Sequence, residues 1–182
     1  MSRKKTGDHV EPRVLESVQG AVVHIPPEGQ VMHLQFRRFA GCPICNLHLQ
    51  AFIRRHSELV ARKILEVAVF HSTKSAMKEH QVSAPFPFIA DAEKKLYRAF
   101  GVETSIRSII SPGAWPAAIK GIFTLGPGFP SSGESPLGLP ADFLIDANGK
   151  ILAVKYGEHA SDQWEFDEVL ALADAEKQAA PV

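Results

Sequence analysis

Strand-like and helix-like segments alternate through the middle of this 182-residue chain. Residues 64–70 are apolar and β-branched, and residues 31–38 also have the character of a strand. Between them, apolar residues recur at helical spacing over 46–61, and His48 is expected on the solvent side of this helix. Two parallel strands joined by a helix require a right-handed crossover of this kind. The alternation therefore predicts an α/β layer fold rather than a β-sandwich.

The flanking segments extend this pattern into one domain at residues 14–178, preceded by a flexible N-terminal tail at residues 1–13. Residues 103–138 are rich in Pro, Gly and Ser, and we expect an insertion there with some helix and a long loop. The other predicted elements are an N-terminal β-hairpin of residues 21–25 and 31–38, a helix at 72–80 capped by Ser72, a helix at 91–100 capped by Asp91 and ended by Gly101, a hairpin of strands 141–145 and 150–156, and a final helix at 161–177.

The charge pattern narrows the classes of partner. Lysine plus arginine and aspartate plus glutamate number 20 each, so the chain lacks the basic field of a nucleic-acid-binding protein and the polybasic face of a membrane-surface protein. The basic N-terminus has no apolar run behind it, which indicates neither a signal peptide nor a membrane span. We therefore expect no nucleic-acid or membrane partner and a cytoplasmic location.

The chain has two cysteines, Cys42 and Cys45, in the sequence Gly-Cys-Pro-Ile-Cys. In a reducing compartment, closely spaced cysteines more often serve catalysis or metal binding than a structural disulfide. A structural zinc site needs four ligands, and the histidines show no second-pair spacing, although histidines brought together by folding leave this possibility open. Packing of both cysteines as small apolar residues, without chemistry, is a further alternative.

A redox role explains each residue of this motif. If Cys42 is the N-cap of the helix and Pro43 its first residue, the Cys42 sulfur faces unpaired amides at the positive helix end, which lowers a thiol pKa. Arg38 or Arg37 adds positive potential, but residues that alternate along a strand cannot both face the sulfur. We expect Cys42 to be the exposed attacking thiolate and Cys45 the more buried resolving thiol.

A strand, the Gly-Cys-Pro-Ile-Cys turn and an amphipathic helix together resemble the active-site element of the thioredoxin superfamily. Within it, the segments PFPFIADAEKKLYRAFGV (85–102) and PADFLIDANGKILAVKYG (140–157) are similar to the AhpC/TSA peroxiredoxin-like branch. The resemblance covers roughly residues 31–172 and leaves the tail and the insertion unmatched. It implies a thioredoxin-like fold with a central mixed β-sheet flanked by helices.

The resemblance also implies two features near the cysteines. A cis-proline, here Pro140, is expected before the strand that faces the pair, where it would shape the site. Peroxiredoxins carry Pro-x3-Thr/Ser-x2-Cys, whose hydroxyl positions the peroxide, but this chain has Phe39 at the hydroxyl position and Gln35 at the proline position. The Cys-Pro-x-Cys form is more similar to glutaredoxin and disulfide-exchange enzymes.

These observations predict a thiol-dependent oxidoreductase, an antioxidant of cell redox homeostasis, that reduces a peroxide or a disulfide. Thioredoxin, glutaredoxin or a small thiol would regenerate the pair, and the chemistry requires no cofactor and no metal. A homodimer is compatible with this prediction. Two alternatives are a dithiol–disulfide reductase without peroxidase activity and a non-catalytic thioredoxin-fold module that senses redox state or binds a partner.

Overall fold

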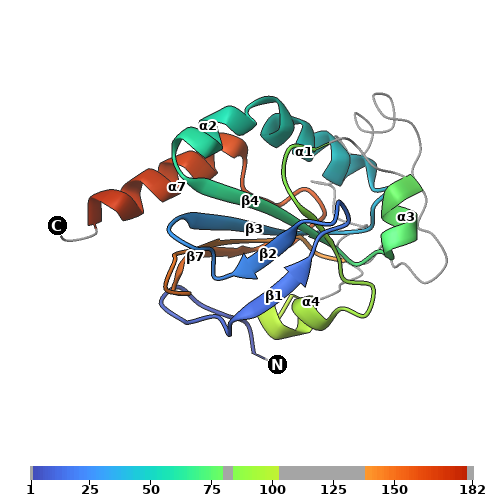
Figure 1. Ribbon diagram of the computed structural model, residues 1–182, viewed down its shortest axis with the longest axis horizontal. Coiled ribbons are helices and arrows are strands. Elements are labelled where there is room, and N and C mark those ends of the chain that lie inside the picture. The colour runs from blue at the N-terminus through green and yellow to red at the C-terminus, as the bar shows by residue number, and fades with distance from the viewer. Residues whose placement is uncertain (1, 80–83, 103–137, 180–182) are drawn as a thin grey trace.

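A mixed five-stranded β-sheet forms the centre of the protein (Figure 1). The computed structural model describes residues 2–79, 84–102 and 138–179, so the predicted insertion lies outside the described residues except for its last position. The strand order is β5-β4-β3-β6-β7. The strands are β3 (Val31–Arg37), β4 (Ile64–Phe70), β5 (Phe88–Ala90), β6 (Ala141–Ile145) and β7 (Ile151–Tyr156). β3 pairs in parallel with β4 and antiparallel with β6, so it is the central strand.

Helices cover one face of the sheet, and a helix with a β-hairpin covers the other (Figure 1). The first layer consists of α1 (Pro43–Arg54), α2 (His56–Ala61) and α7 (Phe166–Ala179). The second consists of α4 (Lys95–Phe100) and the hairpin of β1 (Arg13–Glu16) and β2 (Val22–Ile25), while α3 (Lys74–Glu79) follows β4. Alternate residues of the central strands enter two separate apolar cores, one under each layer. This is the predicted α/β architecture, in a thioredoxin-like arrangement.

The N-terminal hairpin has different strands from those predicted. β2 pairs with β1, whereas residues 31–37 lie in the middle of the main sheet. The burial patterns explain the error. β2 alternates exposed and buried residues, as expected of a strand with one face toward solvent. In β3, six of the seven residues are buried, so this strand requires packing neighbours on both faces. The Ser17 hydroxyl accepts a hydrogen bond from the Ala21 amide at 2.9 Å and stabilises the turn between β1 and β2.

The helix boundaries also differ from the predicted ones. The segment predicted as one helix at 46–61 begins at Pro43 and is interrupted at Arg55, whose backbone leaves helical geometry. The last helix begins at Phe166 rather than at residue 161. The helix predicted at 91–100 begins at Lys95, and its N-cap residue is Lys94. Asp91 nevertheless stabilises the start of α4 as predicted, because its carboxylate accepts hydrogen bonds from three amides, those of Lys95 at 2.9 Å, Leu96 at 2.8 Å and Tyr97 at 3.1 Å.

The N-terminal residues, predicted as a flexible tail, pair with β7 instead. The Gly7 amide donates to the Ile151 carbonyl, and the Ile151 amide donates to Asp8, both at 2.8 Å. Val10 is buried, and its amide donates to Gly149 at 2.8 Å. β7 is an edge strand with unpaired backbone groups, and these hydrogen bonds satisfy part of that edge.

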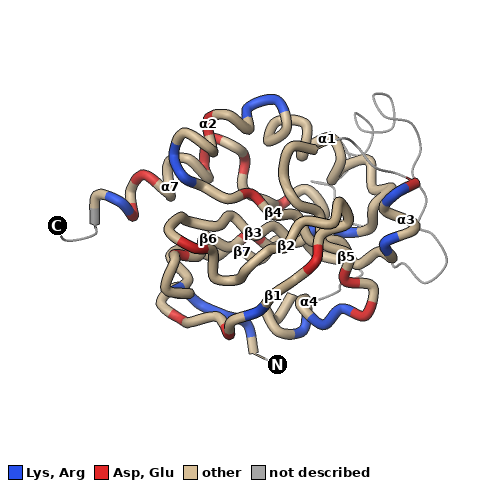
Figure 2. Tube along the Cα trace, viewed as in Figure 1, with Lys and Arg blue, Asp and Glu red and all other residues tan. Residues whose placement is uncertain are grey.

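Basic and acidic residues are interspersed along the same helices and loops (Figure 2), in keeping with their equal numbers. No helix among the described residues is long and apolar enough to cross a membrane.

Replacing Gly101 with alanine tests whether the tail docks against the end of α4. Gly101 has φ 68°, and a Cβ there would lie 2.7 Å from the Ser2 carbonyl oxygen and 2.8 Å from the Arg3 Cα. Gly20 also has positive φ but has no atom within 4 Å of such a Cβ. Left-handed backbone costs an L-residue about 1–2 kcal/mol, so Gly20→Ala should lose about that amount of unfolding free energy and Gly101→Ala clearly more. Urea denaturation measures both values.

The same measurement on a chain without residues 2–6 provides the control. Removal of Ser2 and Arg3 should abolish the excess loss caused by Gly101→Ala and leave the loss caused by Gly20→Ala unchanged. Equal losses for the two alanine variants in the full chain would show that the tail does not pack against Gly101.

Candidate active site

The two cysteines meet at the start of α1, where β3 ends. Cys42 is the N-cap of the helix and Pro43 its first residue, as predicted. The Cys42 Sγ accepts a hydrogen bond from the Cys45 amide at 3.4 Å. The two Sγ atoms lie 2.9 Å apart as free thiols, with the Cys45 thiol donating to Cys42. One helical turn has therefore brought the two sulfurs into direct contact.

Both sulfurs are buried. Cys42 is 0% exposed and Cys45 is 1% exposed, so the prediction of an exposed Cys42 thiol is wrong for this conformation. The neighbouring residues Phe39, Ala40 and Ile44 are buried as well. A substrate can reach either sulfur only if groups around the pair move.

The two thiols ionise as a pair. Burial raises the pKa of Cys45, but its hydrogen bond with Cys42 and the positive charge of Arg38, together with that of Arg37, outweigh burial and lower this pKa to about 6. Burial, followed by the hydrogen bond and negative charge of Cys45, raises the pKa of Cys42 well above its ordinary value. The sequence predicted a lowered pKa for Cys42, but the structure gives the lowered pKa to Cys45. Because a proton can pass between two sulfurs in contact, the first pKa describes the loss of one proton from the pair and not from one particular cysteine.

Side chains far apart in the sequence hold the loop before Cys42. The Ser72 hydroxyl accepts a hydrogen bond from the Ala40 amide at 2.9 Å, and the Asn46 side-chain amide donates to the Ala40 carbonyl at 3.0 Å. Ser72 was predicted as a helix cap, but the Thr73 hydroxyl accepts the hydrogen bond from α3 instead. Ser72 lies two residues after the end of β4, at the same end of the sheet as the end of β3, and this position was the available signal for its role.

Arg38 and Phe39, both predicted to shape the site, lie beside the cysteines in the chain and contact each other. The guanidinium carbon of Arg38 lies 5.5 Å from the centroid of the Phe39 ring. Arg38 is buried, and its Nε has no hydrogen-bond acceptor among the described residues. Its positive charge favours the thiolate form of both cysteines.

The segment before β6 also reaches this region, but not in the predicted form. A Cβ on Gly138 would lie 2.9 Å from the His71 Nε2 and 3.5 Å from the Arg38 Cγ, so Gly138 packs closely against both side chains. Pro140 was predicted to follow a cis peptide bond. In the described part of the chain the one cis bond is Ile25–Pro26, and the Pro140 carbonyl accepts a hydrogen bond from Gly157 at 2.9 Å. The Pro140 carbonyl is therefore used in pairing with the chain just after β7.

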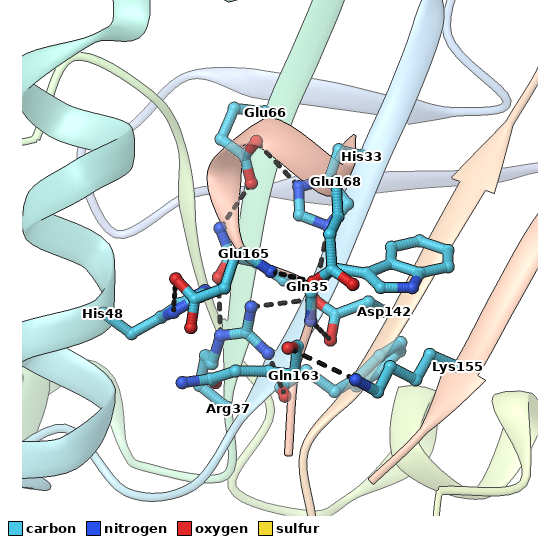
Figure 3. A network of polar contacts seen from close by, with 12 residues as sticks. His33, Gln35, Arg37, His48, Glu66, Asp142, Lys155, Gln163, Glu165 and Glu168 are labelled. Atoms are coloured by element: carbon cyan, nitrogen blue, oxygen red, sulfur yellow. Dashed lines mark hydrogen bonds and ion pairs between the residues drawn. The ribbon is translucent and has the colours of Figure 1, made fainter. Parts of the chain in front are cut away.

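A buried polar network, which the sequence analysis missed, lies beneath α1 (Figure 3). It consists of His33, Gln35 and Arg37 on β3, Glu66 on β4 and Asp142 on β6, all 0% exposed. His33 contacts Glu66 at 2.8 Å and Asp142 at 3.2 Å, Arg37 donates to Asp142 at 2.7 Å and to Gln35 at 2.5 Å, and Gln35 donates to Glu66. The alternation of polar residues along one face of a central strand was the signal in the sequence.

The network holds two acidic and two basic side chains, so its charges balance. Burial lowers the pKa of His33, but Glu66 and Asp142 outweigh burial and raise this pKa to about 9. Burial raises the pKa of Asp142, while Arg37 and His33 lower it well below its usual range. Each buried charge therefore has an opposite charge in contact, as buried ions require.

His48, predicted on the solvent side of its helix, is buried next to this network. Its ring packs against Phe52, and its Nε2 has no hydrogen-bond partner among the described residues. Burial, and the charge of Arg37, lower its pKa well below the ordinary value. Among the described residues, no group of three or more His, Cys, Asp and Glu side chains is arranged to hold a metal ion.

Comparisons with known proteins support the resemblance found in the sequence. The model of the AhpC/TSA family matches residues 21–154. Similar solved structures include the peroxidoxin BcpB of Mycobacterium tuberculosis, with a TM-score of 0.66, 17% identity, and coverage of 98% of this chain and 100% of that one. A mutant of peroxiredoxin 6 from Arenicola marina has a TM-score of 0.72, 16% identity and coverage of 97% and 74%.

A third similar structure comes from Chlorobium tepidum and is assigned as a thiol:disulfide interchange protein DsbE. It has a TM-score of 0.59 and 24% identity, and the match covers 94% of this chain and 99% of that one. No curated protein matches the sequence significantly. At these identities the structural matches establish a thioredoxin-like fold.

The raised pKa of His33 predicts a pH dependence of stability. A histidine with pKa about 9 in the folded chain and about 6.5 in the unfolded chain stabilises the fold fully below pH 6.5, and this contribution is lost as pH rises through 9. In a Cys42→Ser, Cys45→Ser background, which removes the thiol titrations, the unfolding free energy should fall by roughly 3 kcal/mol between pH 6.5 and 9.5. Urea denaturation at a series of pH values measures this.

His33→Gln in the same background should remove most of that slope, and His24→Gln, which replaces an exposed histidine on β2, should keep it. A slope that is the same with and without His33 would contradict the assignment of a buried imidazolium.

Proposed function

Because the chain belongs to the AhpC/TSA family, we propose that it is a thiol-based oxidoreductase whose Cys42 and Cys45 cycle between a dithiol and a disulfide. The observation that carries the proposal is the 2.9 Å contact between the two sulfurs at the start of α1. A disulfide requires about 2.05 Å, so a small movement closes the bond. The substrate is a peroxide or a disulfide.

The two substrates lead to the same oxidised product by different routes. A thiolate attacks a peroxide oxygen, the O–O bond breaks, and the leaving oxygen takes a proton to give water or an alcohol. The resulting sulfenic acid then loses water as the second thiol attacks its sulfur. With a disulfide substrate, the thiolate attacks one sulfur, the substrate S–S bond breaks and one substrate thiol leaves, which gives a mixed disulfide. The second thiol of the pair then attacks this mixed disulfide and releases the other substrate thiol. A dithiol such as thioredoxin or glutaredoxin, or a small thiol, reduces the pair again, and these steps use no metal or cofactor.

We assign the attack to Cys42 and the resolving step to Cys45. Burial and the neighbouring Cys45 raise the pKa of Cys42, but the charge of Arg38 and the hydrogen bond from the Cys45 amide act in the opposite direction and favour a thiolate on Cys42 at the moment of attack. Cys45 lies one turn inside the helix. The contact between the sulfurs lets the shared proton move to Cys45 as the charge moves to Cys42.

A second candidate function is disulfide reduction without peroxidase activity. Phe39 occupies the position at which peroxiredoxins carry the hydroxyl that positions peroxide, and its ring is buried under Arg38. The nearby Ser72 hydroxyl binds the Ala40 amide, which assigns it to holding the loop. This departure favours a disulfide as the oxidant.

Stopped-flow oxidation of the reduced protein separates the two functions. Hydrogen peroxide and a small disulfide should each oxidise the wild-type pair, with peroxide slower if the missing hydroxyl matters. Cys42→Ser should abolish both reactions, and Cys45→Ser should stop at a sulfenic acid or a mixed disulfide. Oxidation by the disulfide alone would select the second candidate, and no oxidation by either reagent would leave a non-catalytic module.

The rate of oxidation should follow the ionisation of the pair. With the pKa of Cys45 lowered to about 6, the rate constant should fall about tenfold per pH unit below pH 6 and change little above pH 7. The pH profile of the same stopped-flow reaction measures this. A rate that still climbs between pH 7 and 9, as for a free thiol of pKa about 8.5, would contradict the lowered pKa.

A further inference from the structure

The placement of α1 over β3 locates Arg37 relative to the cysteines. Because β3 and β4 are parallel neighbours, the helix between them must run back along the sheet. The His33 ring stacks against Phe52 of α1, with centroids 5.5 Å apart. Along β3, Arg37 lies about 13 Å beyond His33, and along α1, Cys45 lies about 10 Å back from Phe52. Arg37 therefore lies beneath the first turn of α1, on the side of Cys45.

The charge of Arg37 affects the pKa values of two side chains of α1, Cys45 and His48. The charge of Arg37 contributes to the lowered pKa of Cys45 and to that of His48, which follows Cys45 on the same helix. Figure 3 shows His48 and Arg37 on the same side of the network. The guanidinium thus acts toward the first two turns of α1 and not only toward its partners in the sheet.

The network leaves Arg37 no freedom to move. Its Nε donates to Gln35 at 2.5 Å, and its terminal nitrogens donate to Asp142 at 2.7 Å and to the Phe36 carbonyl at 3.2 Å. Gln35 is in turn fixed by Glu66. All of these side chains are fully buried, so water does not compete for the guanidinium.

We infer that the buried network makes Arg37 a positioning residue, a fixed cation beneath Cys45 that, together with Arg38, raises the reduction potential of the cysteine pair. This inference rests on the dithiol–disulfide cycle proposed above. Reduction adds two electrons and creates a thiolate, whereas the disulfide is neutral. A cation in this place therefore stabilises the reduced form alone and makes the pair a stronger oxidant.

The other charged groups around the pair set the sign of each expected change. Arg38 in the loop adds positive charge near the sulfurs, and neutral His48 adds none. In the sheet, Asp142 opposes Arg37 directly, and Glu66 and His33 lie farther along the network. Removing Arg37 and removing the charge of Asp142 should therefore shift the potential in opposite directions.

Equilibration with dithiothreitol measures the potential. The reagent's two thiols become a cyclic disulfide while the Cys42–Cys45 disulfide becomes one thiol and one thiolate, so two electrons and one proton pass to the pair and the second proton goes to the solvent. For Arg37→Gln the equilibrium constant for reduction of the protein should fall about tenfold, which corresponds to about 30 mV. In a pH titration, the ultraviolet absorbance of the thiolate should appear at a higher pH in Arg37→Gln than in the wild type. For Asp142→Asn both quantities should change in the opposite direction.

Two further variants separate charge from structure. Arg37→Lys keeps the charge while losing the forked hydrogen bonds, and its potential should stay closer to the wild type than that of Arg37→Gln. Arg54→Gln removes the same charge from the exposed end of α1 and should leave the potential unchanged.

The outcomes distinguish this inference from the proposed function. Opposite shifts for Arg37→Gln and Asp142→Asn support a fixed cation, because simple damage to the network would move both variants the same way. Shifts in the same direction, or none, would overturn the inference while leaving the redox cycle in place. A wild-type pair that forms no disulfide at all would overturn both.

Discussion

The contact between the Cys42 and Cys45 sulfurs depends on the cap of α1. Because the Cys42 side chain takes the place of the usual capping oxygen, its sulfur is held at the helix start and Cys45 follows one turn later. Pro43 fits between them because the first helical residue needs no amide hydrogen. The loop before the cap is fixed in turn by Ser72, which lies just after β4, and by Asn46 of α1.

The central strand connects this site to the interior of the protein. One face of β3 supports the apolar core under α4, and the other carries three polar residues into the layer under α1. Burying charges is unfavourable unless each is paired, and an apolar face of the same volume would often be more stable. The ionic network lies directly below the helix that carries the cysteines (Figure 3), which is the position that the proposed redox role requires.

The sequence was sufficient to predict the parts that depend on local patterns. The cap at Cys42, the helix after it, the Asp91 cap and the hairpin of β6 and β7 all follow from neighbouring residues, and the AhpC/TSA resemblance supplied the fold. The pairing of β1 with β2 and of the N-terminal residues with β7 depends on which sheet edges remain open, which no local pattern encodes.

The same limit applies to the site. The burial of Cys42 and the position of the lowered pKa depend on groups that folding brings together, among them Arg38 and the charges of the sheet. The network joins residues from three strands, and the sequence shows only the alternation of His33, Gln35 and Arg37.

The central claim is that the two cysteines form one redox unit, and the most direct test is the mass of the peptide that contains both. After treatment of the reduced protein with one equivalent of oxidant, that peptide should lose the mass of two hydrogen atoms and regain it with a dithiol. A peptide that keeps both free thiols, or a disulfide that joins two chains instead, would contradict the account.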